Sequence, residues 1–280
     1  MSFKSSAQAL HTAARRYCQS KSNYWYQIAT ELQETKPCDP SSYRQTLLDN
    51  YACSKVLMMI CTELEKLDPE KLVDIENTRE LIVHIGRVAQ EFPQRPNMGQ
   101  TSVRQVVQSI FGINTEDAIA KEREAFCTYI KELSDSQLKF IQPLPYQRVL
   151  SPAESSTMWQ KLRARWHING WYWHPLIKCE LSNVTAFNVD AFEAFFSSFN
   201  LIEMLSSRGI TRVWELREYG VEYYQDVLLF DPIYNGYEGY WTSDCLDWIV
   251  YASHEASVTV GGWLLENIKT QWSEWEQHVW

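Results

Sequence analysis

The spacing at which apolar residues recur changes along the chain, and this change restricts the fold more than any other feature. In the first half, apolar residues repeat every three or four positions, which is typical of amphipathic helices. One such stripe consists of Leu57, Ile60, Leu64 and Leu67. In the second half, residues 213–217 alternate as a half-buried strand does. We therefore expect an α+β protein, in which a helical bundle precedes a smaller mixed domain with an antiparallel sheet.

Charge and tryptophan content also differ between the two halves. Residues 1–150 hold 18 basic and 18 acidic side chains, whereas residues 151–280 hold 8 basic and 17 acidic ones. The second half therefore accounts for the whole net charge of −9. Eleven of the 12 tryptophans lie from Trp159 onward.

The boundary between the halves is predicted near residues 142–151, where Pro143 and Pro145 interrupt any helix. We expect a helical bundle domain over residues 1–145. An acidic, tryptophan-rich α+β domain is expected over residues 146–280.

Three further apolar stripes favour five or six helices in the first domain. They comprise Leu81, Ile85, Val88 and Phe92; Val103, Val106, Val107 and Ile110; and Ile119, Phe126, Ile130 and Leu133. The middle stripe follows Ser102, a suitable N-cap, and ends at Gly112. These residues are expected to form the core of the bundle.

The second domain shows signals for both helices and strands. Ser151 and Glu154 form a capping-box pattern that predicts a helix to about Trp166. A longer helix is expected from Asp190 to about Leu205, with Gly209 at its left-handed C-terminal position. Further elements are predicted as strands over 213–217, 223–229, 247–251 and 257–260, a loop over 231–242, and a closing helix over 263–275.

Several classes of protein are disfavoured by the sequence. Residues 1–10 lack the apolar core of a signal peptide, and no apolar run is long enough for a membrane span. Seven cysteines without CxxC spacing indicate free thiols and a cytoplasmic location. The acidic second half disfavours nucleic acid. Neither a phosphate-binding loop nor a zinc-ligand pattern occurs, so no cofactor or metal is expected.

The segment 214–247 is the strongest candidate for a functional surface. It carries eight acidic residues against the single basic Arg217, together with nine aromatic residues. Aromatic rings supply buried area in interfaces, and carboxylates attract a basic partner. We expect a protein-binding site for a basic partner protein, formed by Tyr234, Tyr237, Glu238, Trp241, Asp244 and Asp247. The alternative is that residues 231–242 fold back onto their own domain as a lid.

Two other functions stay open. A hydrolase acting on a glycan or similar polar substrate would use the acid–base candidates Asp244, Asp247, His254 and Glu255. A homo-oligomer would instead use the aromatic face to contact copies of itself.

The acidic and aromatic second half resembles, in size and order of elements, the small intracellular α+β immunity domains of the SUKH-type superfamily. That resemblance implies a protein that neutralises a toxin by masking it. It is one of architecture and composition, and no residue role is transferred from it.

Overall fold

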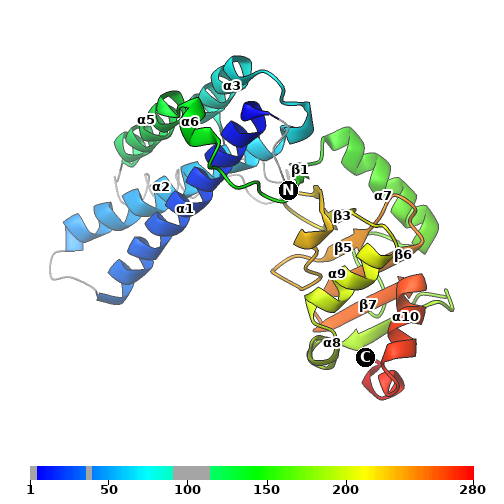
Figure 1. Ribbon diagram of the computed structural model, residues 1–280. Coiled ribbons are helices and arrows are strands. Elements are labelled where there is room, and N and C mark those ends of the chain that lie inside the picture. The colour runs from blue at the N-terminus through cyan, green and yellow to red at the C-terminus, as the bar shows by residue number, and fades with distance from the viewer. Residues whose placement is uncertain (1–4, 36–39, 91–113) are drawn as a thin grey trace. The chain divides into compact units, whose positions relative to one another are not determined.

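The computed structural model describes residues 5–35, 40–90 and 114–280. The chain divides into two compact units, residues 1–144 and residues 145–280 (Figure 1). The helical elements of the first unit and the sheet of the second unit confirm the predicted α+β class.

The described part of the first unit is helical. Its α-helices are α1 (Ser6–Thr35), α2 (Pro40–Glu65), α3 (Ile75–Val88), α5 (Glu116–Glu132) and the short α6 (Asp135–Leu138). A 3₁₀ turn, η1 (Pro69–Lys71), lies between α2 and α3. Asp74 caps α3 by accepting from the amide of Asn77 at 2.7 Å. The expected stripe that begins after Ser102 lies outside the described residues.

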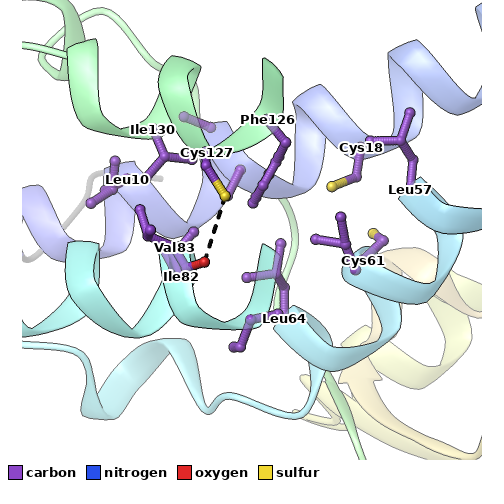
Figure 2. Packing of buried hydrophobic residues seen from close by; sticks show 14 of the residues in the cluster. Leu10, Cys18, Leu57, Cys61, Leu64, Ile82, Val83, Phe126, Cys127 and Ile130 are labelled. Atoms are coloured by element: carbon purple, nitrogen blue, oxygen red, sulfur yellow. Dashed lines mark hydrogen bonds between the residues drawn. The ribbon is translucent and has the colours of Figure 1, made fainter. Parts of the chain in front are cut away.

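The core of the first unit is built from apolar faces of α1, α2, α3 and α5. Leu10, Leu64 and Phe126 are fully buried in it, and Cys127 donates to the carbonyl of Val83 at 3.6 Å (Figure 2). Burial of such a continuous apolar surface is the main stabilising contribution to a bundle.

The stripe predicted for α3 is only partly right. Ile85 is buried, but Leu81 and Val88 are exposed, and Phe92 lies outside the described residues. Ile82 and Ala89 face the core instead. The helix is therefore rotated from the predicted orientation, because the side that carries Gly86 lies directly against Phe126 of α5.

The second unit contains one seven-stranded sheet in which every pair of neighbouring strands is antiparallel. The strand order is β1-β4-β3-β5-β6-β7-β2. Their bounds are β1 (Gln147–Val149), β2 (Val184–Asn188), β3 (Arg212–Arg217), β4 (Tyr223–Asp226), β5 (Gly239–Thr242), β6 (Trp248–Ser253) and β7 (Ser257–Gly262).

Both faces of this sheet are covered by helices. Helix α7 (Pro152–Trp166) packs on the face that contains Leu216, Tyr240 and Tyr251. Helices α8 (Val189–Phe195), α9 (Ser198–Ser207) and α10 (Trp263–Gln271) cover the other face. Since β6 is buried on both faces, its six residues form a continuous buried run rather than an alternating one.

The predicted helix at Ser151 is confirmed, because Ser151 and Glu154 form the capping box of α7. The long helix expected from Asp190 is wrong in one respect: α8 ends at Phe195, and α9 begins at Ser198. Gly209 has a positive φ, as predicted for the left-handed position that follows the helix.

The strand predicted over 223–229 is shorter than expected and gives way to the 3₁₀ turn η2 (Val227–Leu229). The closing helix begins at Trp263 as expected but ends at Gln271. The loop expected over 231–242 is wrong in its last part, because Gly239–Thr242 is strand β5 in the middle of the sheet.

Candidate functional site

The turn between β6 and β7 brings together residues from several parts of the second unit. Gly239 pairs with Ala252, so Glu238, just before β5, lies beside the end of β6 where His254 follows. The neighbouring strand β3 ends at the same end of the sheet. There the amide of Glu218 donates to the carbonyl of Glu238 at 3.0 Å. The antiparallel register thus collects Glu218, Glu238 and His254 at one end of the sheet.

Glu238 and His254 form the centre of this arrangement. Glu238 is 1% exposed, and its Oε1 accepts from the backbone amide of His254 at 3.2 Å and from the imidazole Nδ1. On the other side of the ring, Nε2 lies 3.2 Å from Oε1 of Glu255. The hydrogen bond to Glu238 raises the pKa of His254 above its ordinary value, and Glu255 and Glu218 contribute in the same direction.

The turn that carries His254 is held by several hydrogen bonds. The buried hydroxyls of Ser253 and Ser257 lie 2.7 Å apart, and Ser253 Oγ also accepts from the amide of Glu255 at 3.2 Å. The carbonyl of Ala256 accepts from the amide of Val189 at 3.0 Å. The carbonyl of Glu255 accepts from the indole of Trp280 at 3.0 Å. These bonds fix the backbone of the turn, and the position of His254 is therefore well defined.

Two tyrosine rings lie close to His254, and a second pair of tyrosines belongs to the same end of the sheet. The ring of Tyr172 lies 5.8 Å from that of His254, and the ring of Tyr234 lies 6.4 Å from it. Tyr219 and Tyr237 form an edge-to-face pair at 6.5 Å. The four tyrosines are 39–42% exposed. We call the set Tyr172, Glu218, Tyr219, Tyr234, Tyr237, Glu238, His254 and Glu255 the His254 cluster.

The carboxylates of the His254 cluster also shift the pKa of neighbouring tyrosines. Glu218 raises the pKa of Tyr172 above its ordinary value, with Glu238 contributing as well. Beneath the cluster, burial and then Glu238 raise the pKa of Tyr251. Oε2 of Glu238 is buried without a hydrogen bond among the described residues. A carboxylate held in this state favours a cationic group close to it.

The two remaining acidic candidates lie at the opposite end of the strands. Asp244 and Asp247 belong to the connection between β5 and β6, whereas His254 follows the far end of β6. Six residues of strand at about 3.3 Å each separate these ends by roughly 20 Å. Asp244 is bonded there by the indole of Trp214 at 2.7 Å and by the hydroxyl of Tyr224 at 3.4 Å. The four acid–base candidates therefore do not meet at one place.

The six residues expected to bind a partner are divided in the same way. Tyr234, Tyr237 and Glu238 lie in the His254 cluster, and Asp244 and Asp247 are exposed at the other end. Trp241 is 2% exposed and packs in the core beside Phe230. Its burial follows from its position in β5, which the sequence did not reveal.

Three residues of the cluster, Tyr172, Glu218 and Tyr219, were not predicted as site residues. Tyr172 belongs to the aromatic run after α7, and Glu218 and Tyr219 belong to the acidic and aromatic segment that follows β3. No local pattern links them to His254, since the contact depends on the strand order. The exposed tyrosines and the buried carboxylate of Glu218 can be recognised as parts of one site only once the strand order is known.

The described residues form neither a metal site nor a membrane-spanning helix. No group of three His, Cys, Asp or Glu side chains among them is placed to hold a metal ion. Among the described helices, none combines the length and apolar character needed to cross a bilayer. Comparison of the chain with protein-family models, with curated proteins and with solved structures found no match in any of the three.

Proposed function

We propose that the protein binds a basic partner protein through the His254 cluster. The main observation behind this proposal is the grouping of four half-exposed tyrosines with the exposed carboxylate of Glu255, above the buried carboxylates of Glu218 and Glu238, at one end of the sheet. A guanidinium or ammonium group pairs with carboxylates and also stacks on tyrosine faces. Tyrosine and its polar hydroxyl are common in the buried centres of interfaces.

Charge and rigidity support the same function. The surplus of acidic side chains over residues 151–280 attracts a basic partner from a distance and speeds its association. Since hydrogen bonds at both ends of the turn already hold His254 in place, little ordering entropy is lost on binding. Two biological roles fit this binding mode: neutralisation of a basic toxin in the cytoplasm, or assembly of a complex.

The proposal is tested by affinity capture with the full chain as bait, followed by mass spectrometry. The double variant Tyr234→Ala/Tyr237→Ala and the single variant Glu255→Lys change exposed parts of the cluster. Asp247→Lys is the matched control, because it adds the same charge at the other end of the sheet. A basic protein recovered in equal amounts by the wild type and by Asp247→Lys is expected to be lost by both cluster variants and at raised salt.

Two outcomes would contradict the proposal. Equal recovery of the partner by all baits would exclude the His254 cluster as the site. Recovery of the bait alone by the wild type would argue against a binding module. The mass of the purified protein in solution separately shows whether the cluster binds a second copy of the chain.

A hydrolase is the second candidate, and one observation favours it. A buried carboxylate that holds Nδ1 of a histidine, as Glu238 holds His254, also orients the imidazole in acid–base catalysis. The hydroxyl of Ser253 is engaged by Ser257 and by the amide of Glu255, so it is not aligned as a nucleophile. This function would be established in preference to protein binding if the protein hydrolysed a polar substrate, if His254→Gln abolished that activity, and if Asp244→Asn kept it.

A further inference from the structure

The first unit contains a polar pocket that is independent of the His254 cluster. It has a volume of about 680 Å³, within the range of small-molecule sites. Trp25 of α1 contributes to its lining. Helix α2 supplies Gln45, Asp49, Asn50 and Cys53, and helix α5 with the residue before its N-cap supplies Asn114, Asp117, Ala118, Lys121, Glu122 and Ala125.

Helical spacing explains why these residues share one pocket. Gln45, Asp49 and Cys53 follow one another at intervals of four, so they lie along one side of α2. Ala118 and Glu122 have the same relation on α5. The two helices are joined across the pocket by Gln45, whose Nε2 donates to the carbonyl of Asn114 at 2.9 Å and to Asp49 Oδ1 at 2.8 Å. Cys53 donates to the carbonyl of Ala118 at 3.7 Å.

The floor of the pocket holds two polar groups with unused hydrogen-bonding capacity. Glu122 and Asn50 are each 7% exposed. The indole of Trp25 donates to Glu122 Oε2 at 3.0 Å, whereas Glu122 Oε1 is buried with no hydrogen bond among the described residues. Nδ2 of Asn50 is likewise buried with no hydrogen bond among the described residues. An unsatisfied buried carboxylate oxygen is costly, and a ligand that donates to it removes that cost.

The charge of the pocket indicates the kind of ligand. Asp49, Asp117 and Glu122 bring three carboxylates against the single ammonium of Lys121. The pKa of Cys53 is consistent with this negative charge. Burial, followed by Glu122 and Asp49, raises it to about 11. The described residues include no group of three His, Cys, Asp or Glu side chains placed to hold a metal ion. An organic cation with several hydrogen-bond donors therefore fits this pocket better than a metal ion does.

We propose that this pocket binds a small organic cation with N–H donors, an alkylamine or a guanidine. Its charged head donates to Oε1 of Glu122 at the floor, and Asp49 and Asp117 attract a second positive group near the rim. Trp25 and the methyl groups of Ala118 and Ala125 contact the alkyl part of the ligand. The amide of Asn50 donates to an acceptor on the ligand or to a water that the ligand carries.

Calorimetric titration of the full chain with four probes tests this proposal. Putrescine and agmatine are the cations, butanediol is a neutral analogue, and succinate is an anionic one. We expect the two cations to bind and the other two compounds not to bind. Glu122→Gln keeps the shape of the floor and should weaken binding of both cations by roughly tenfold or more, the effect of losing one charge-assisted hydrogen bond.

Two further variants complete the experiment. Glu124→Gln removes an exposed charge on the same helix outside the pocket and should bind the cations as the wild type does. Asp117→Asn, on the exposed rim, should weaken putrescine binding. This variant tests the proposal even if Glu122→Gln fails to fold. The proposal is overturned if neither cation binds the wild type, if succinate or butanediol binds as well as putrescine, or if both pocket variants keep wild-type affinity.

Discussion

Glu238 holds His254 at two points, since a single oxygen of its buried carboxylate accepts from both the backbone amide and the imidazole Nδ1 of that residue. The pair joins the residue before β5 to the turn after β6, so it fixes both the position of the ring and its electrostatic environment. Whichever function the His254 cluster serves, binding or catalysis, the protonation of this imidazole is set mainly by Glu238.

The pKa of His254 is predicted to lie above its ordinary value of 6.5 and to fall in Glu238→Gln. Glu255→Gln should lower it less, because the hydrogen bond to Glu238 is the largest contribution to the shift. Titration of the imidazole signal by NMR, assigned with His254→Gln, measures all three values. An equal or larger decrease in Glu255→Gln would contradict the assignment of Glu238 as the main partner.

The same pair predicts a pH dependence of stability. Because the pKa of His254 is higher in the folded state, the protonated ring stabilises the fold fully below the unfolded value and loses this effect as pH rises through the folded value. The difference in free energy of unfolding between the wild type and His254→Gln should therefore shrink above neutral pH. Urea unfolding at a series of pH values provides the measurement, and a difference that grows with pH would have the wrong sign.

His11 is predicted to act in the opposite direction. It is buried in the first unit, with Nε2 2.9 Å from the carbonyl of Leu64, and burial lowers its pKa to about 4. Below pH 6.5 the unfolded chain takes up a proton that the folded chain does not, so stability falls between about pH 6.5 and 4, by up to about 3 kcal/mol.

Substitution isolates the contribution of His11. His11→Gln keeps a donor for the carbonyl of Leu64 and should reduce the loss of stability on acidification. His84→Gln, at an exposed position of α3, should keep the wild-type dependence. Denaturant unfolding between these pH values compares the three proteins, and parallel curves for all of them would show that His11 is not the responsible group.

Local signals in the sequence were sufficient for much of the fold. The capping box at Ser151, the alternation over residues 213–217 and the run over residues 257–260 all correspond to the elements predicted from them. Each depends on interactions within a few residues, which a local pattern reports. The strands β1, β2 and β5 were missed because each has at most five residues and pairs with a strand that is distant in the sequence.

The candidate site was predicted less completely, for the same reason. Glu238 and Asp244 are six residues apart in sequence but lie at opposite ends of β5, because that strand runs between them. Conversely, Tyr172 and His254 are far apart in sequence and adjacent in space. Charge and aromatic content identify the right segment, but strand register decides which residues meet.

The buried ion pair between Arg15 and Glu65 is predicted to be a requirement of the helical bundle. Arg15 donates to Glu65 Oε1 through Nη2 at 2.9 Å and through Nε at 3.3 Å, and both side chains are less than 10% exposed. Arg15→Met leaves the carboxylate buried without this partner and should lower the free energy of unfolding by about 3–5 kcal/mol. The double variant Arg15→Met/Glu65→Met should recover much of that loss, since no buried charge is left.

The matched control for this pair is Lys66→Met. Lys66 forms an ion pair with Glu63 in which both side chains are partly exposed, so its loss should cost no more than about 1 kcal/mol. Denaturant unfolding of the four proteins measures these differences. If Arg15→Met were no more harmful than Lys66→Met, the buried pair would not be a structural requirement of the bundle.

Gly86 is predicted to tolerate no larger residue, although it lies inside helix α3. A Cβ at this position would lie 2.6 Å from Cδ1 of Phe126 and 3.0 Å from Sγ of Cys127. In an unhindered helix, Gly→Ala stabilises by about 0.5–1 kcal/mol. Here the ring of Phe126 is fully buried and cannot move aside without disturbing the core, so overpacking should cost about 1–3 kcal/mol and outweigh the gain in helix propensity.

The compensating variant shows whether this contact is the cause. Phe126→Leu removes the ring atoms that the added methyl group would meet, so Gly86→Ala should be less destabilising in that background than in the wild type. His84→Ala, on the exposed side of α3, controls for helix propensity and should change stability by no more than about 0.5 kcal/mol. Equal effects of Gly86→Ala in both backgrounds would mean that α3 and α5 do not approach each other at Gly86 and Phe126.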